Sequence, residues 1–533
     1  MPYNCLGYTI AVYDIRSARH GEEVDVDDLT RSSGILLHPT SLPGRFGIGD
    51  LGDTAYEWID FLVACGQALW QVLPLGPTGF ADSPYACLSA FAGNPLLISP
   101  DKLVETGDLD EADLDDLPSF PDDEVDYGAV IAYKIPLLQK AARHFSAQST
   151  AERRGEYERF CAANAAWLGD FALFMAVKER FQQVSWYEWD ADIALRRPQA
   201  IAHWAQALAQ EVTTHKVLQS FFFEQWQRVK AYANERGIQI VGDVPIFVAP
   251  DSADVWANRD LFYLDEGGRP TLISGVPPDY FSETGQRWGN PLYRWDVMAV
   301  RGYAWWIDRM RATLRAVDIV RIDHFRGFMA YWEIPASEPT AVKGRWVPGP
   351  GAAVFEAIEQ ALGKLPIWAE DLGVITPEVI ALRERFDLPG MKILQFAFDE
   401  EALRASFGDY TRNPFLPHNY TPHFVVYTGT HDNDTALGWF NHCAEAERQR
   451  AMAYLGCDDK AFNWSLIRAA MASVARIAVI PLQDVLGLDS QARMNLPGTT
   501  GSNWRWRCPP GALTDALAAR LDEMVRLYER TGR

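Results

Sequence analysis

From about residue 34 onward the chain alternates short apolar runs with longer amphipathic stretches. Runs of four to eight apolar or β-branched residues bounded by Gly, Pro or Asp indicate buried strands, and apolar residues repeating every three or four positions indicate helices. Such alternation predicts parallel βα units. Eight strands are predicted, at residues 34–42, 68–75, 237–248, 316–324, 365–371, 391–399, 423–432 and 477–485.

Eight parallel strands with intervening helices are typical of a closed α/β barrel, so we predict a (β/α)8 TIM barrel over residues 34–533. The first helix is expected to begin at a capping box formed by Thr54 and Glu57 and to stop at Gly66. A final helix is expected at about 511–530, which leaves no room for a C-terminal β-domain.

Two intervals are too long for simple crossovers. Residues of about 100–235 contain several helical patterns and predict a mainly helical insertion after the second strand. Residues 250–296 are rich in Gly, Pro and aromatic residues, which predicts a long ordered loop over the barrel mouth after the third strand. Residues 1–33 are polar and acidic, join no later pattern and are interpreted as an N-terminal extension.

The net charge and the cysteine pattern indicate which partners and which cell compartment to expect. A net charge of -22 and a pI near 4.9 repel phosphate backbones and anionic lipid, so neither nucleic acid nor a membrane surface is expected as a partner. The seven cysteines include no CxxC pair, and no uninterrupted apolar run has membrane-spanning length. We therefore expect a cytoplasmic protein with reduced thiols.

Four of the predicted strands end at or lead into acids. In barrel enzymes the active site is built at the carboxyl ends of the strands. A single Asp in this position commonly caps the next helix. Four acids that point to the same end of the barrel favour a catalytic or binding role over helix capping. They are Asp243 in VGDVPIF, Asp323 in VRIDHFRG, Glu370 in WAEDLG and Asp432 in TGTHDND.

The residues beside these acids favour glycoside cleavage over metal binding. Strand alternation places Arg321 and Asp323 on the same side, and a guanidinium there keeps a carboxylate ionised and opposes a metal cation. Glu370 follows the apolar run LPIWA, an environment that holds a carboxyl protonated for general-acid work. His324 and His431 add donors suited to sugar hydroxyls.

Together with further motifs, these acids resemble one family. GILLHPTSLPGRFGIGDLG, DSPY with SAFAGNPLLI, TGQRWGNPLY and NLPGTTGSNW occur in order with the four acid motifs. The chain from about Gly34 onward is similar to the amylomaltase, or disproportionating-enzyme, family of 4-α-glucanotransferases in the α-amylase superfamily.

The resemblance implies a retaining transfer of an α-1,4-glucan segment to another sugar, without a cofactor or metal. Its implied partners are maltooligosaccharides and α-1,4-glucans, and the oligomeric state is left open. Asp323 would be the nucleophile, Glu370 the acid/base and Asp432 the transition-state stabiliser. Substrate-binding residues would be Tyr85, Asp243, Gln286, Trp288, Arg321, His324, His431 and Asn503. The family often has Gln after SPY, whereas Ala86 and Cys87 follow here.

Three alternatives stay open beside this interpretation. An α-glucan hydrolase would use the same carboxylates with water as acceptor, and the catalytic-strand motifs do not separate the two. The loop from Gly275 to Trp295 favours transfer, because Tyr280, Phe281 and Trp288 offer aromatic faces for an acceptor sugar. A glucan-binding barrel without activity would have no use for a nucleophile beside Arg321. A metal-dependent hydrolase would need clustered His ligands.

Overall fold

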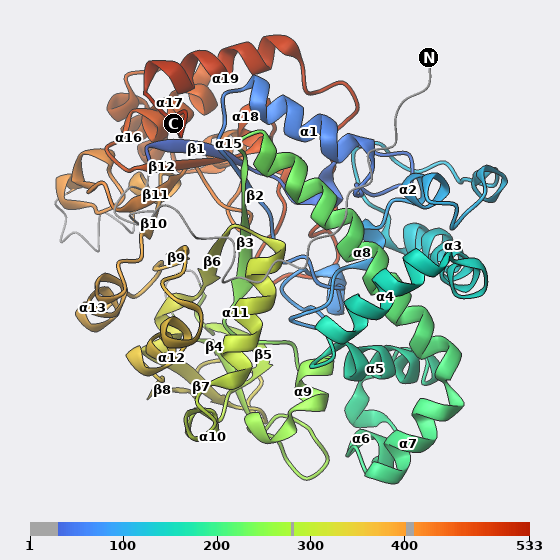
Figure 1. The fold of residues 1–533 in the computed structure, drawn as a ribbon. Coiled ribbons are helices and arrows are strands. Elements are labelled where there is room, and N and C mark those ends of the chain that lie inside the picture. Colours follow the sequence, from blue (N-terminus) through green and yellow to red (C-terminus); the bar gives the residue numbers. More distant parts are fainter. Residues whose placement is uncertain (1–29, 279–281, 401–409, 533) are drawn as a thin grey trace.

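Eight parallel strands form the central barrel of this computed structural model, which describes residues 30–278, 282–400 and 410–532. The strands are β1 Ser32–Leu36, β2 Leu69–Gln71, β3 Gln239–Pro245, β6 Ile319–Asp323, β9 Ile367–Ala369, β10 Gly390–Ile393, β11 Phe424–Tyr427 and β12 Ile477–Pro481. They lie in the order β10-β11-β12-β1-β2-β3-β6-β9, and the amide of Ala369 donates to the carbonyl of Pro389 across the remaining gap, at 2.9 Å. All eight predicted strands, and with them the barrel, are confirmed (Figure 1).

Helices follow the strands around the outside of the barrel. These outer helices and connecting helices are α1 Asp53–Ala64, α9 Ala253–Ala257, α10 Trp295–Val300, α11 Ala304–Ala316, α12 Ala352–Leu362, α13 Pro377–Arg385, α15 Ala436–His442, α16 Glu445–Leu455, α17 Phe462–Ala472, α18 Leu482–Leu486 and α19 Asp515–Leu527. The predicted capping box of the first helix is wrong: α1 begins at Asp53 after Gly52, so Thr54 already lies inside the helix. Its predicted stop at Gly66 agrees with the left-handed φ of 67° there.

The segment between β2 and β3 is helical. Its helices are α2 Pro100–Glu105, α3 Tyr127–Gln148, α4 Ala151–Ala163, α5 Leu168–Arg180, α6 Ala191–Ala194, α7 Pro198–Ala207 and α8 Ala209–Glu235. The last of these, α8, returns the chain to the barrel wall. There Trp226 packs against Trp70 of β2 with ring centroids 6.0 Å apart, and both side chains are fully buried.

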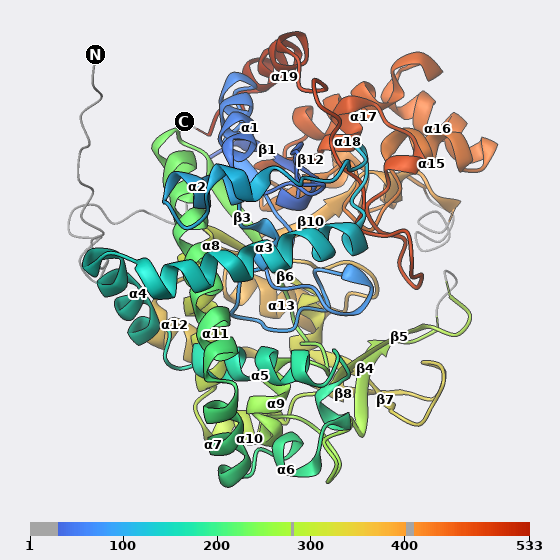
Figure 2. The same ribbon diagram turned by 90° about the vertical axis from the view of Figure 1, so that its right-hand side faces the viewer.

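A second sheet lies beside the barrel and differs from the loop expected at residues 250–296. It consists of four antiparallel strands in the order β5-β4-β7-β8, with bounds β4 Leu272–Val276, β5 Gln286–Pro291, β7 Ala330–Pro335 and β8 Arg345–Pro348. Two of its strands precede β6 and two follow it. Figures 1 and 2 show this sheet with α5–α7, α9 and α10 at one end of the molecule, opposite α1, α17 and α19.

Both ends of the described chain meet at β1. Ser32 pairs with Ile477 of β12, two residues before the expected boundary at residue 34. The buried Arg530 side chain donates to six backbone carbonyls, those of Ser32, Met471, Ala470, Ser473, Ala475 and Arg476. This one guanidinium thus fastens β1 to the segment that leads into β12.

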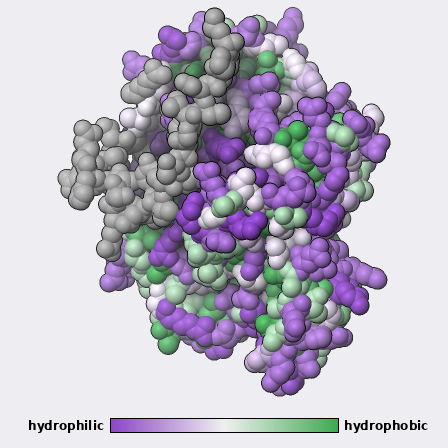
Figure 3. Space-filling view, turned by 45° about the vertical axis from the view of Figure 1, so that its right-hand side comes forward, coloured by the Kyte–Doolittle hydropathy of each residue, from purple (hydrophilic) through white to green (hydrophobic). Residues whose placement is uncertain are grey.

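The surface is mostly hydrophilic on the face that Figure 3 shows, and hydrophobic residues form small patches between the hydrophilic ones. Across the described ranges, no single helix combines the length and apolar character needed to cross a bilayer, although the bent pair α4 and α5 passes that test jointly by length and composition alone.

Candidate active site

The four strand-end acids come from neighbouring parts of the barrel. Asp323 is the last residue of β6, and Glu370 directly follows β9, its neighbour in the sheet. Asp243 lies inside β3, two residues before its end, in register with Arg321. Asp432 is reached through the segment after β11. The expected placement at the carboxyl ends of the strands holds, with Asp243 set slightly deeper than expected.

Arg321 links two of these acids. Its Nη1 lies 2.5 Å from Asp243 Oδ2 and its Nη2 lies 3.0 Å from Asp323 Oδ1, as expected from strand alternation. Burial opposes the charge on the guanidinium, but Asp243 and Asp323 outweigh burial and hold the pKa of Arg321 well above its usual value. Tyr85 completes the group, since its hydroxyl donates to Asp243 Oδ2 at 2.8 Å. The cation is therefore permanent and its position is fixed.

Asp323 and Glu370 differ in their affinity for a proton. Burial, reinforced by the charge of Asp323, raises the pKa of Glu370 to about 8. Burial also raises the pKa of Asp323 to about 6, against the lowering effect of Arg321. The guanidinium alone was expected to set the ionisation of Asp323; instead it limits an upward shift caused by burial. At neutral pH the pair thus holds one proton, on Glu370.

Backbone amides hold the Glu370 carboxyl in place. Oε2 accepts from the amide of His324 at 2.7 Å, and Oε1 accepts from the amide of Leu372 at 2.9 Å. His324 adopts a left-handed φ of 55°, a conformation uncommon outside glycine. Because His324 follows Asp323 directly, this turn joins the backbone beside one carboxylate to the side chain of the other.

Asp432 is held as an anion. Its Oδ1 accepts from Asn495 Nδ2 at 2.6 Å, and His431 Nε2 lies 3.4 Å from its Oδ2. Burial acts to raise the pKa of Asp432, but His431 and Asn495 outweigh it and hold the pKa well below the usual range. Burial likewise disfavours charge on His431, and Asp432 outweighs burial and raises its pKa. His324, by contrast, is kept neutral because burial lowers its pKa to about 3.

Comparisons with known proteins agree with this arrangement. The family model described as 4-alpha-glucanotransferase matches residues 37–514. The chain belongs to the 4-alpha-glucanotransferase family. It is 54% identical over 504 residues to the 4-alpha-glucanotransferase of Synechocystis, covering 94% of this chain and 98% of that protein. The Thermus thermophilus 4-alpha-glucanotransferase is 52% identical over 511 residues, 94% of this chain and 100% of that protein.

A solved structure supports the same membership. The amylomaltase from Streptococcus agalactiae in complex with acarbose superposes with a TM-score of 0.89 at 40% identity, covering 94% of this chain and 99% of that one. This chain is therefore an enzyme of the 4-alpha-glucanotransferase type, as the sequence predicted.

Several of the other residues expected to bind substrate in this glucanotransferase meet near the acids. Tyr85 stacks on His431, with ring centroids 5.0 Å apart and an interplanar angle of 19°. Trp288 of β5 meets His324 edge-on at 4.8 Å and is 39% exposed. Gln286 Oε1 accepts from Trp288 Nε1 at 3.1 Å. The β4–β5 hairpin thus reaches the residue beside Asp323. Tyr280 and Phe281 lie outside the described residues.

Asn503 is engaged within its own loop. Its Oδ1 accepts from the amide of Leu496 at 3.0 Å, and its Nδ2 donates to the carbonyl of Thr499 at 3.1 Å. Sequence reasoning missed Asn495, eight residues earlier, which contacts Asp432. It also missed Arg493, which donates to the backbone carbonyls of Asp432 and Asn495. An Asn before Leu-Pro-Gly resembles an ordinary turn residue, so only its place within the family motif NLPGTTGSNW could have singled it out.

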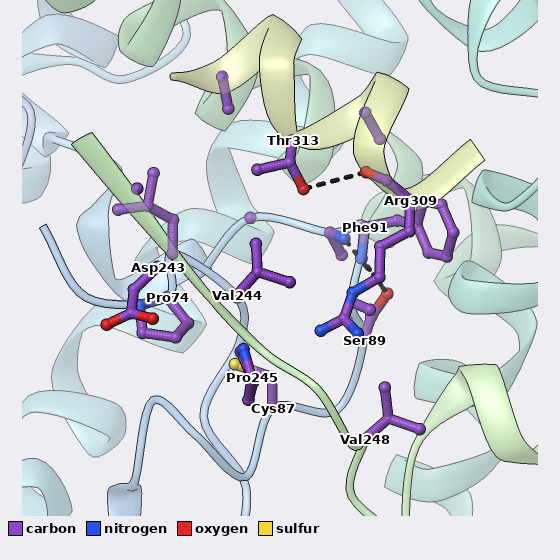
Figure 4. Close-up of a pocket in the computed structure, with 18 of the residues that line it drawn as sticks. Pro74, Cys87, Ser89, Phe91, Asp243, Val244, Pro245, Val248, Arg309 and Thr313 are labelled. Atoms are coloured by element: carbon purple, nitrogen blue, oxygen red, sulfur yellow. Dashed lines mark hydrogen bonds between the residues drawn. The ribbon is translucent and has the colours of Figure 1, made fainter. Parts of the chain in front are cut away.

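Asp243 and Tyr85 also line a cavity, which Figure 4 shows with Asp243 and Cys87 labelled. Cys87, the second residue after Tyr85, lines it, donates from Sγ to the carbonyl of Pro84 at 2.8 Å and has a pKa raised to about 12 by burial. An inert thiol and the Ala86 methyl therefore occupy the positions where the sequence departs from the family pattern.

Proposed function

We propose that this enzyme transfers a segment of an α-1,4-glucan to the 4-hydroxyl of glucose or another glucan by a retaining double displacement. Asp323 is the nucleophile, Glu370 the acid/base and Asp432 the stabiliser of the transition state. The observation that carries the proposal is the geometry of two carboxyls, Asp323 bonded to Arg321 and Glu370 held by the amide of the next residue, His324; the higher pKa of Glu370 agrees with its role as the acid.

In the first step Asp323 attacks the anomeric carbon while Glu370 gives its proton to the leaving glycosidic oxygen. A covalent glucosyl-enzyme and a shortened glucan result. The two carboxyls of retaining enzymes lie about 5 to 5.5 Å apart. The hydrogen bond from the amide of His324, next to Asp323, to Glu370 Oε2 supports such a spacing.

In the second step Glu370, now a carboxylate, takes the proton of the incoming 4-hydroxyl as that oxygen displaces Asp323. Each step inverts the anomeric carbon, so the α-linkage is restored. Asp432 is held ionised by His431 and Asn495, which suits it to accept hydrogen bonds from sugar hydroxyls as the ring flattens and positive charge develops.

Substrate contacts are proposed for the residues around these three. Asp243, Arg321, His324 and His431 line the subsite of the broken sugar, and Tyr85 contributes an aromatic face to it. Gln286 and Trp288 contact the acceptor. The support for the latter pair is the position of Trp288 against His324, next to the nucleophile.

Transfer wins over hydrolysis when an acceptor sugar is bound in attacking geometry. Water competes for the covalent intermediate at roughly 55 M, whereas an oriented intramolecular reactant reaches effective molarities on the order of 10^5 M or more. A partly exposed Trp288 beside the nucleophile is a suitable wall for an acceptor site.

Incubation with maltotriose alone tests the proposal. We expect glucose together with a ladder of longer glucans and little rise in total reducing ends. Trp288→Ala is expected to slow transfer more than cleavage, and Trp346→Ala, an equally exposed Trp on the same small sheet, serves as the matched control. A steady rise in reducing ends with no product longer than maltotriose would identify a hydrolase instead.

We further propose a cytoplasmic location with no nucleic-acid or membrane partner. The six cysteines in the described part of the chain are all unpaired, which fits a reducing compartment. Fractionation of the source cells, with the activity followed in the soluble and membrane fractions, tests this.

A further inference from the structure

A second hollow, with a volume of about 390 Å³ and open to solvent, is lined by residues other than the four strand-end acids. One wall comes from the helical segment between β2 and β3, at the start of α5, and the other from α9, α10 and one face of α11. The loop that follows β2 forms its floor through Ser89 and Phe91. Ligand-binding cavities typically hold about 300–1000 Å³, so this hollow is within the range of ligand sites, and its open side lets a longer chain extend beyond it.

Aromatic rings line the hollow. Phe91 stacks on Trp167, with centroids 6.3 Å apart and an interplanar angle of 18°, and meets Trp305 edge-on at 5.9 Å. All three side chains are only partly buried. The indole nitrogen of Trp305 has no hydrogen-bond partner among the described residues. Flat apolar surfaces with polar edges are suited to the C–H faces and hydroxyls of sugars.

The charges around the hollow balance. Three carboxylates and three guanidinium groups line it, those of Asp170, Asp254, Asp308, Arg301, Arg311 and Arg315. Most of them are paired: Asp308 with Arg311, Asp170 with Arg196 and Arg301 with Asp260. The exposed Arg315 makes no ion pair or hydrogen bond within the described chain. The N–H groups of its guanidinium are therefore available to donate to sugar hydroxyls. Balanced charge favours a neutral polyol over an anion.

The loop that follows β2 lies between this hollow and the cavity beside the active site. Ser89, Phe91 and Ala312 also line the cavity of Figure 4, in which Asp243 lies on the side away from Ser89 and Phe91, and Tyr85 lines the same cavity. The loop is anchored between them, because Asp254 Oδ2 accepts from the amide of Ala90 at 2.7 Å. A chain held in the hollow would therefore lie close to the subsite of the broken sugar without occupying it.

We propose that this hollow is an accessory binding site for an α-1,4-glucan chain, which holds a stretch of a long substrate outside the catalytic cleft. The proposal rests on the proposed function for the identity of the ligand. The site strengthens binding of long glucans such as amylose and leaves turnover of maltotriose unchanged, because a trisaccharide in the cleft does not reach it.

Binding is measured by retardation in native gels cast with amylose, and catalysis by disproportionation of maltotriose. Trp167→Ala and Arg315→Ala are each expected to weaken retardation by at least about threefold, while kcat/KM for maltotriose stays within about twofold. Arg526→Ala, on α19, is the control for Arg315→Ala. Trp167 contributes to packing, so its variant is compared with wild type by thermal unfolding; Arg315 is exposed and gives the same test without that risk.

Stoichiometry provides a second readout. In the inactive Asp323→Asn background, titration with maltoheptaose should reveal two sites per chain, and adding Trp167→Ala or Arg315→Ala should leave one. Amylose retardation equal to wild type in both folded variants, or a single maltoheptaose site in Asp323→Asn, would overturn the accessory site. Neither result affects the proposed function, whose own failure appears as the absence of longer glucans from maltotriose.

Discussion

Single residues carry the chemistry, and their environments set their roles. Glu370 is buried and the Asp323 side chain is 28% exposed, and Arg321 contacts Asp323 at 3.0 Å. A permanent cation lowers the pKa of the carboxyl beside it, whereas burial alone raises it. Together with the charge of Asp323, which further raises the pKa of Glu370, that difference supports the proposed roles of Asp323 as nucleophile and Glu370 as acid.

Replacing the proposed nucleophile is expected to remove the covalent step. Asp323→Asn keeps the size of the side chain and its place beside Arg321, so we expect maltooligosaccharide binding to persist while turnover falls by at least about three orders of magnitude. Steady-state kinetics and a binding titration on the same sample check this. Near-normal turnover would move the nucleophile to another residue.

Glu370 is expected to matter only when the leaving group needs a proton. Glu370→Gln should be severely impaired on maltotriose but should form the glucosyl-enzyme readily from α-glucosyl fluoride, because fluoride leaves without protonation. Rapid-quench measurement of fluoride release and maltotriose cleavage compares the two donors. Equal loss on both would contradict the acid/base assignment.

The pH dependence follows from the same pair. The first step needs Asp323 ionised and Glu370 protonated, with pKa values of about 6 and about 8. As pH falls through 6 the nucleophile becomes protonated, and as pH rises through 8 the acid loses its proton, so kcat/KM for maltotriose should be bell-shaped with its maximum between these values. With α-glucosyl fluoride, Glu370→Gln should lack the alkaline fall. A maltotriose profile still rising at pH 9 would be inconsistent with this assignment.

At the scale of elements, the barrel strands were predictable and the small sheet was not. Each barrel strand is a local apolar run flanked by turn residues, as in 477–485, so its signal is contained in its own sequence. In the small sheet β4 precedes β6 in the sequence and pairs with β7, which follows β6, and β5 reads Gln-Arg-Trp-Gly-Asn-Pro, with no apolar alternation. Neither a long-range pairing such as β4–β7 nor a short polar strand such as β5 leaves a periodic pattern to detect.

The same limit applies to the site: residues on the barrel strands were predictable, and residues on irregular loops were not. The four acids and Arg321 stand at the ends of strong strand signals. The contact of Asn495 with Asp432 depends on a loop after β12 that contains no regular element. The family resemblance pointed to Asn503 as a substrate-binding residue of the same loop; its hydrogen bonds lie within the loop, and its contact with substrate stays a prediction.

The two asparagines of this loop should therefore respond differently to truncation. Asn495→Ala removes the 2.6 Å hydrogen bond to Asp432, and misplacing a catalytic group lowers turnover by about 10- to 100-fold. Asn503→Ala is the matched control, expected to loosen the loop with a smaller change in kcat. Kinetics on maltotriose compare them, and a larger loss of kcat in Asn503→Ala would reverse the two roles.

For the whole molecule, the arrangement of charge predicts independence from metal ions. Arg321 is bonded to Asp243 and Asp323 at the centre of the acid cluster, and a buried cation there opposes a second one. Activity on maltotriose should survive dialysis against a strong chelator. Buffer-dialysed enzyme is the control, and a loss that added calcium or zinc restores would contradict the prediction.

Arg530 has a consequence for how the enzyme is made. Its Nη1 donates to the carbonyl of Ser32 across 498 residues of chain. At about 5–20 residues per second of synthesis, β1 is made roughly 25–100 s before the side chain that fastens it. For most of that interval β12, which is Ile477–Pro481, has not been made either, so the edge of β1 that β12 covers has no partner. The nascent chain therefore depends on its early helices, or on a chaperone, to keep that edge from pairing with another chain.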